Sequence, residues 1–219
     1  MQLSEPMTMI TDYLLGGWTF YLAFKLIRKG MRVSQRSIIL WGLSFVATGI
    51  AALIGGTSHG FALYFGTMTK AVIWTATLIS IGFASLFLLS SAIITTFKKP
   101  LRDWLIAATA LKFILFAVWI VSHSEFKYVI YDYVPAMIGV LTVQVYGKYS
   151  RGDKSAVWII SGILISFGAA AVQQSGFTLH EHFNHNDLYH VIQMGAIYML
   201  YKGGILLLDA GADSSHDME

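Results

Sequence analysis

The feature that most limits the fold of this chain is a series of apolar runs, several of which reach about 20 residues. A run of that length crosses the roughly 30 Å hydrocarbon core of a bilayer as an α-helix. Only 12% of the residues are charged, whereas about 25% is usual in a soluble domain. The sequence therefore predicts an all-α membrane protein.

Seven such runs predict a single domain over residues 1–219, folded as a seven-transmembrane-helix bundle. The glycine-rich stretch 55–60 leaves open whether the second helix ends there or continues. Residues 209–219 are acidic and rich in small side chains, which predicts a flexible tail. The pairs Gly16–Gly17 and Gly203–Gly204 predict close helix packing. The predicted spans cover residues 10–28, 37–57, 68–96, 103–122, 128–147, 155–173 and 187–208.

The basic residues predict how the bundle is oriented. Eleven of the fifteen Lys and Arg residues lie around the connections between spans one and two, three and four, and five and six. Cytoplasmic loops carry such an excess, so we expect the N-terminus outside and the C-terminus inside. Short loops and the absence of a targeting signal favour a bacterial inner membrane. These basic residues follow membrane topology, so no nucleic-acid partner is expected.

Several chemistries find no support in the sequence. The chain has no cysteine, which excludes disulfides, thiolate metal sites and a thiol nucleophile. It also lacks a Walker-type phosphate loop and the G-x-S-x-G elbow of serine hydrolases. The stretch Gly55–Ser58 is glycine-rich, but it ends a predicted membrane helix and is not a phosphate cradle.

The most distinctive polar stretch is residues 180–190, which holds four of the seven histidines directly before the last span. Six of the seven histidines fall on the predicted outer, periplasmic side. Imidazoles and carboxylates gathered at one end of an apolar helix are typical of a metal site or a proton relay. A solvated loop has the same composition, and we interpret His180 and His182 in that way.

His190 lies about one turn inside the last span, where it shares a helical face with Asn186 and Asp187. His185 precedes it by five residues, about 140° around a regular helix. His185 and His190 can therefore bind one ion only if the helix begins after His185. Asn186 or Asp187 as the N-cap would allow this.

Three charged residues within or beside the apolar spans are functional candidates, because a charge there costs at least about 2.5–3.5 kcal/mol. Asp132 has either a structural role, as a helix cap or a partner of Lys70, or a catalytic one. Lys70 is expected to reach the membrane interface. Lys112 is expected to pair with a carboxylate that the sequence does not identify.

The seven spans, Ser58–His59 at the outer end of the second, and Leu188–His190 entering the seventh together resemble the CREST superfamily. That group includes alkaline ceramidases and the progestin and adipoQ receptors. The resemblance implies a zinc ion held by histidines of the second and seventh helices. His59 and His190 match two of these ligands, and Ser58 matches the family's serine.

Three features depart from the CREST pattern. Ser58 is adjacent to His59, whereas the family spaces its serine and histidine about one helical turn apart. Asn186 stands where the family's H-x-x-x-H motif has its first histidine, and His185 lies beside it. The family's aspartate near the third helix is missing, and Asp132 is the buried substitute on the outer side. The third zinc ligand is therefore either His185 or Asp187.

Two functions from different classes follow. The first is a membrane-embedded zinc-dependent hydrolase that attacks a lipid-like amide or ester with metal-activated water. In it, Asp132 or Asp187 acts as general base, and Ser58 stabilises the oxyanion. The second is a non-enzymatic receptor, sensor or transporter, in which the outer histidines titrate or take up a metal transiently. Both place the protein in the lipid bilayer.

Overall fold

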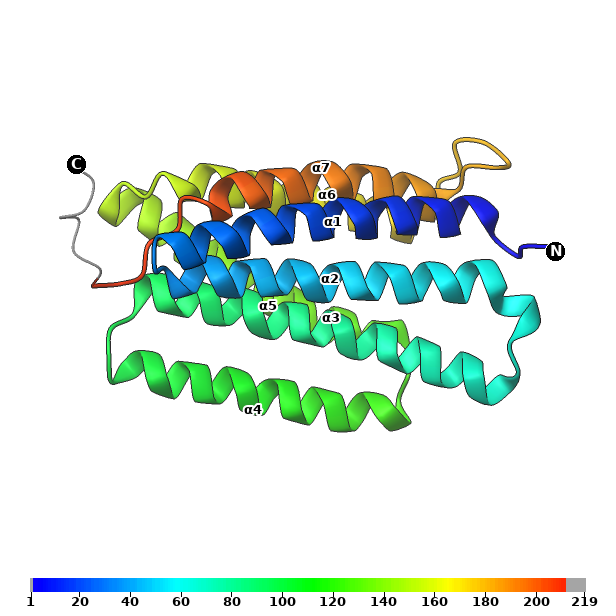
Figure 1. Ribbon diagram of the computed structural model, residues 1–219, viewed down its shortest axis with the longest axis horizontal. Helices are drawn as coiled ribbons and strands as arrows, with labels where there is room; N and C mark the ends of the chain where they lie inside the picture. The colour runs from blue at the N-terminus through cyan, green and yellow to red at the C-terminus, as the bar shows by residue number, and fades with distance from the viewer. Residues whose placement is uncertain (1, 212–219) are drawn as a thin grey trace.

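The computed structural model describes residues 2–211, which fold into seven α-helices and one short 3₁₀-helix (Figure 1). No β-strand occurs within residues 2–211, where the one β-bridge joins His180 to Phe183. The predicted all-α class and the number of helices are confirmed. The α-helices are α1 (Pro6–Arg32), α2 (Arg36–Phe61), α3 (Thr67–Thr96), α4 (Leu101–Ser122), α5 (Phe126–Arg151), α6 (Ser155–Ser175) and α7 (His185–Gly204), and η1 (Ala62–Tyr64) follows α2.

Five of these helices, α2 to α6, are long and apolar enough to cross a membrane. The other two, α1 and α7, are also long enough, but they carry more polar and charged residues. A membrane protein is therefore indicated, and the two helices outside this set of five, α1 and α7, pack against each other (Figure 1).

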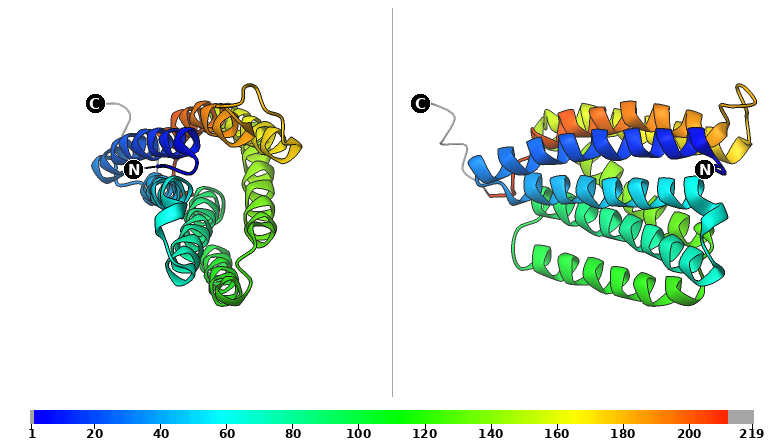
Figure 2. Two further views of the ribbon diagram at one scale, coloured as in Figure 1. Left: turned by 90° about the vertical axis from the view of Figure 1, so that its right-hand side faces the viewer. Right: turned by 45° about the vertical axis from the view of Figure 1, so that its right-hand side comes forward.

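Six helices form a closed ring in the order α1, α2, α3, α5, α6 and α7. Helix α4 lies outside the ring, packed on α3 (Figure 2). The helices alternate in direction, so the starts of α1, α3, α5 and α7 lie at the same end as residue 2 (Figure 1). We call this the N-terminal end, and the other the basic end because it holds the three basic connections.

The main hydrophobic core lies between the middle of the ring and the basic end. It draws side chains from all six ring helices, among them Leu22, Trp41, Met137, Ile163 and Leu200. A second, smaller cluster attaches α4 near the N-terminal end and includes Leu78, Phe116, Ile120 and Val129. The basic half of the ring thus holds most of this apolar core, together with buried uncharged polar side chains such as Ser91 and Gln144.

Glycines allow the closest helix contacts. A Cβ atom added to Gly16 would lie 2.9 Å from Leu53 Cδ2 on α2. One added to Gly203 would lie 2.4 Å from Ile159 Cγ1 on α6, and one on Gly204 would lie 2.4 Å from Trp41 Cδ1. Gly17 has no such neighbour within 4 Å. The predicted close packing therefore involves Gly16, Gly203 and Gly204.

Helix boundaries differ from the predicted spans at two functionally important places. Helix α2 continues through the glycine-rich stretch to Phe61, so Ser58 and His59 lie in its last turn. Helix α7 begins at His185 and ends at Gly204, four residues before the predicted end. It ends early because the chain turns there, with Leu206 N–H donating to the Gly203 carbonyl at 3.0 Å.

Asp209, predicted as the first residue of a flexible tail, is instead fixed at the start of α2. Its carboxylate accepts hydrogen bonds from the backbone N–H groups of Arg36 and Ser37 at 3.0 and 2.9 Å, and from the Ser37 hydroxyl at 2.6 Å. Ala210 N–H donates to the Ile94 carbonyl at 2.9 Å. The remainder of the predicted tail, residues 212–219, lies outside the described residues.

Candidate functional site

A buried polar cluster joins α1 to α7 near the N-terminal end. His190, in the second turn of α7, is only 7% exposed, and Asp12 on α1 is 6% exposed. The His190 Nε2 atom lies 3.2 Å from Asp12 Oδ1, and its Nδ1 atom lies 2.9 Å from the Thr11 hydroxyl oxygen. Both ring nitrogens of this histidine are therefore occupied by side chains of α1.

Asp187 completes the cluster one turn before His190. It is fully buried, and its Oδ1 atom lies 3.5 Å from the Thr11 hydroxyl. Its Oδ2 atom accepts a hydrogen bond from the Asn184 backbone N–H at 2.8 Å, while the Asn184 side chain accepts from the N–H groups of Asn186 and Asp187. This reciprocal arrangement is a capping box, which fixes both the start of α7 and the Asp187 carboxylate.

The N-cap of α7 is therefore Asn184, whereas the sequence predicted Asn186 or Asp187. This correction places His185 inside the helix, about 140° around the axis from His190. The His185 Nδ1 atom is buried and has no hydrogen-bond partner among residues 2–211. His185 and His190 thus point in different directions and are not brought together on one ion.

The spacing of polar residues on α1 places them on a single face. Thr11 and Asp12 lie three and four residues after Thr8, so they share its helical face, and all three are buried. Gly56 on α2 allows α1 to approach, since a Cβ atom there would lie 2.8 Å from Asp12 Cβ. A bulkier residue at position 56 would displace the helix that carries Asp12.

A second pair lies at the rim of the cluster, where the N-terminal segment crosses the end of α2. His59 Nδ1 is 3.0 Å from Glu5 Oε2. The Ser4 hydroxyl donates to the His59 carbonyl at 2.5 Å, and Ser4 N–H donates to the Gly60 carbonyl at 3.1 Å. Glu5 and Asp187 lie close enough to Asp12 to interact with it electrostatically. His59 likewise lies close enough to interact electrostatically with His190.

The predicted site residues thus separate into groups. Asp187 and His190 share the buried cluster, and His59 lies at its rim with Glu5 as its partner. Ser58 is half-buried in the same turn of α2 as His59. His180 and His182 are exposed in the loop before α7, as expected for a solvated loop.

Asp132 belongs to a different site. It is buried on α5, and its Oδ1 atom lies 2.7 Å from the Lys112 ammonium nitrogen on α4. The same ammonium donates to the Asp132 carbonyl at 2.9 Å and to the Ser85 hydroxyl at 3.0 Å. The unidentified carboxylate partner of Lys112 is thus Asp132, and Asp132 pairs with Lys112, not with the exposed Lys70.

The ligand set for the zinc ion implied by the CREST resemblance is not assembled in this structure. Within residues 2–211, no three His, Asp or Glu side chains are arranged to hold a metal ion. Both ring nitrogens of His190 face α1 side chains, and the side-chain Oδ1 of Asn186 accepts a hydrogen bond from the Gln173 side-chain amide at 3.2 Å. The zinc site remains a prediction that this geometry does not supply.

Asp12 is the central residue that the sequence analysis missed, together with its neighbour Thr11. The available signal was a carboxylate inside the first apolar run, since an ionisable group at membrane depth is a functional candidate by default. Asp12 meets His190 only because α1 lies beside α7. The two residues are 178 positions apart in the sequence, so no local pattern joins them.

The fold and the cluster define a class: a helical membrane protein with a buried histidine–carboxylate site at one end. The chain belongs to a family of unknown function, DUF6962, whose profile matches residues 7–209. That match covers all seven helices and the whole cluster except its rim residue Glu5. No curated protein matches the chain in sequence.

Proposed function

We propose that this protein is a membrane receptor or sensor that binds a small cation at the α1–α7 cluster. The observation that carries the proposal is a shortage of positive charge. Asp12 contacts the His190 imidazole and Asp187 contacts the Thr11 hydroxyl, and neither of these buried carboxylates forms an ion pair with a Lys or Arg among residues 2–211. Buried charges are normally paired or bound to a metal ion.

The protons of the cluster explain why it attracts a cation. The Thr11 hydroxyl has one proton, which it gives either to His190 Nδ1 or to an oxygen acceptor such as Asp187 or the Thr8 carbonyl. In the second arrangement His190 donates from Nδ1, so Nε2 faces the Asp12 carboxylate and needs a further proton. In this second arrangement the cluster has a vacancy for one positive charge, whether from a proton or a metal ion.

The position of the cluster favours a receptor or sensor over a conducting pathway. The buried ionisable side chains of residues 2–211 all lie toward the N-terminal end, whereas the buried polar side chains toward the basic end are uncharged, such as Ser91 and Gln144. A charge moving across the bundle would find no buried side chain of opposite charge toward the basic end among residues 2–211. By the positive-inside rule the N-terminal end faces the outside, which is the periplasm in a bacterial inner membrane.

The cation is tested by its effect on stability. A ligand at 100 times its Kd stabilises the folded state by about 2.7 kcal/mol. If the cation is a metal ion, we expect the melting temperature of the detergent-purified protein to rise when a divalent cation is added at constant pH. If it is a proton, we expect the melting temperature to rise as the pH is lowered in buffer that contains a chelator. Asp12→Asn should remove that response. Glu125→Gln, which changes an exposed carboxylate paired with Lys127, should retain it.

The same response in wild type and Asp12→Asn, or no response in wild type, contradicts the proposal. Comparing the response of the melting temperature to added metal with its response to pH distinguishes a metal ion from a proton.

The orientation of the chain in the membrane is tested with introduced cysteines, which is possible because the chain has no cysteine of its own. Ser124→Cys at the N-terminal end should react with an impermeant maleimide in intact cells, and Ser150→Cys at the basic end should not.

A second candidate function is the membrane hydrolase, and one observation favours it. Thr11, His190 and Asp12 form a hydroxyl–imidazole–carboxylate chain with links of 2.9 and 3.2 Å. These are the groups of a nucleophile, a general base and an orienting acid. His190 would take the proton of the Thr11 hydroxyl, and the substrate would be a lipid-like amide or ester.

Product analysis separates the two candidates. A hydrolase should release a fatty acid from a ceramide-type or ester substrate, with that release lost in both Thr11→Val and His190→Gln. Sensitivity to a chelator together with stoichiometric bound zinc would favour the predicted zinc route. Absence of any product from wild-type protein in a bilayer rules out hydrolysis of the substrates tested.

A further inference from the structure

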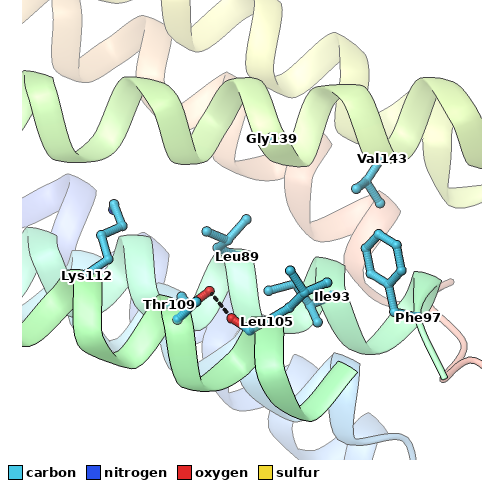
Figure 3. Close-up of a pocket in the computed structure, with 9 residues that line it drawn as sticks. Leu89, Ile93, Phe97, Leu105, Thr109, Lys112, Gly139 and Val143 are labelled. Carbon is cyan, nitrogen blue, oxygen red and sulfur yellow. Dashed lines mark hydrogen bonds between the residues drawn. The ribbon is translucent and has the colours of Figure 1, made fainter. Parts of the chain in front are cut away.

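An open groove lies between α3, α4 and α5 (Figure 3). Its volume is about 370 Å³, within the usual range for small-molecule sites. Eight of the nine residues that line it carry no charge, and Lys112 is the ninth. The lining residues are Leu89, Ile93, Phe97, Leu105, Ala108, Thr109, Lys112, Gly139 and Val143.

A second groove of about 350 Å³ continues along α4 and α5 toward the N-terminal end. It shares Lys112 with the first groove, so the two meet at that residue. Its far end is aromatic and includes Trp119, Tyr128 and Tyr131. From Leu105 to Trp119 the joined groove follows α4 for about 21 Å, longer than one leaflet of the hydrocarbon core.

Lys112 does not make the groove polar. Its ammonium group forms hydrogen bonds to Ser85, to the Asp132 carbonyl and to the Asp132 carboxylate, which uses all three of its donors. Figure 3 shows the side chain extending from α4 toward α5. The groove is thus lined by the methylene stem of Lys112, while its charge is neutralised beside α5.

We propose that this groove binds a long-chain amphiphile, with its chain along α4 and its polar head at the aromatic end. All three helices that form the groove are long and apolar enough to cross a membrane. The groove runs along α4, parallel to the acyl chains of a surrounding bilayer. The head group would meet Trp119, Tyr128 and Tyr131, since amphipathic rings favour the membrane interface.

The attachment of α4 keeps this groove open. Helix α4 contacts α3 along its length and meets the second hydrophobic cluster near the N-terminal end. Beyond that cluster, the link from α4 to α5 is the Lys112–Asp132 pair. On the α5 wall Gly139 has no side chain, which leaves space opposite Ala108 and Leu89. A chain-shaped molecule fits this space without displacing a helix.

Photo-crosslinking tests the site in the full-length protein in liposomes. The probe is a long-chain fatty acid that carries a diazirine and a clickable tag. In wild type we expect adducts concentrated on the groove residues of α4 and α5. Ala108→Trp, which fills the groove from α4, should lower them about tenfold, the change produced by a steric cost of about 1.4 kcal/mol.

Two further variants serve as a control for added bulk and as a second way to fill the groove. Ala107→Trp places the same bulk on an exposed neighbouring position of α4 that does not line the groove, and should label like wild type. Gly139→Val fills the groove from α5, where a Cβ atom would make an ordinary 3.5 Å contact with Leu89, and should also lower labelling.

Adducts spread evenly over all exposed helices, unchanged in Ala108→Trp and Gly139→Val, would show annular lipid only and overturn the proposal. A dimer without bound amphiphile in native mass spectrometry would also overturn it, because a second copy would then cover the groove.

Discussion

Helices α7 and α4 have similar lengths, 20 and 22 residues, but they are held in the molecule in opposite ways. Helix α4 is apolar around most of its surface, yet few of its side chains are buried. Helix α7 is more polar, and it packs on α6 and α1 through glycine contacts and the His190–Asp12 pair. In a membrane, apolar surface does not hold helices together, because lipid is equally apolar, so polar contacts and close packing do.

The largest expected effect comes from removing a partner inside the α1–α7 cluster. Asp12→Ala leaves buried His190 without its carboxylate, and breaking a buried pair in this way costs about 3–5 kcal/mol. Thermal unfolding in detergent should show a large fall in melting temperature. Leu14→Ala, at an exposed position on the same helix, is the matched control. Equal melting temperatures for the two variants would mean that the pair does not hold α1 to α7.

Overpacking the α6–α7 contact should have a smaller effect. Gly203→Leu forces side-chain atoms against Ile159 and the Ser155 carbonyl, and overpacking costs about 1–3 kcal/mol. Gly195→Leu makes the same change on the same helix where no atom lies within 4 Å, and should leave the melting temperature near that of wild type. If both variants melt alike, close packing does not distinguish α7 from α4.

At the basic end, Asp209→Ala removes the acceptor at the start of α2. Loss of an N-terminal cap of this kind costs about 0.5–2 kcal/mol. Hydrogen exchange should speed up for the first turn of α2, where Arg36 and Ser37 lose their acceptor. Asp209→Asn retains an acceptor oxygen and should show a weaker effect. Unchanged exchange in Asp209→Ala would show that the ordered segment after α7 does not stabilise α2.

The smallest effect is expected on α4. Val118 is 71% exposed, and Val118→Ala should change the free energy of unfolding by no more than about 0.5 kcal/mol. Denaturation in detergent measures this. A loss above about 1 kcal/mol would mean that the exposed face of α4 is covered by protein, and the contrast with α7 would fail.

Much of the fold could be predicted from the sequence, because apolar run length is a local property. The seven helices and the loop position of His180 and His182 follow from that pattern. The start of α7 was missed because Asn184, Asn186 and Asp187 are all good N-caps. The capping box that selects Asn184 depends on side-chain geometry.

The candidate site was only partly predictable, for a different reason. His190 and Asp187 are found from residue type and position near a helix start. Asp12 becomes their partner through the packing of α1 on α7, a contact between the two ends of the chain. The partner of Lys112 was equally hidden, because Asp132 lies on the next helix and no local spacing joins them.

The central claim is that the Asp12, Asp187 and His190 cluster lacks one positive charge and takes up a cation. Equilibrium binding to the detergent-purified protein tests it most directly. Calorimetric titration measures binding of a divalent cation, and a second titration, in buffer that contains a chelator, counts the protons that the protein takes up. Wild type should bind one cation per chain by one of these two measurements, and Asp12→Asn should bind none. Equal binding by the two proteins, or no uptake of either metal or protons by wild type, would contradict the account.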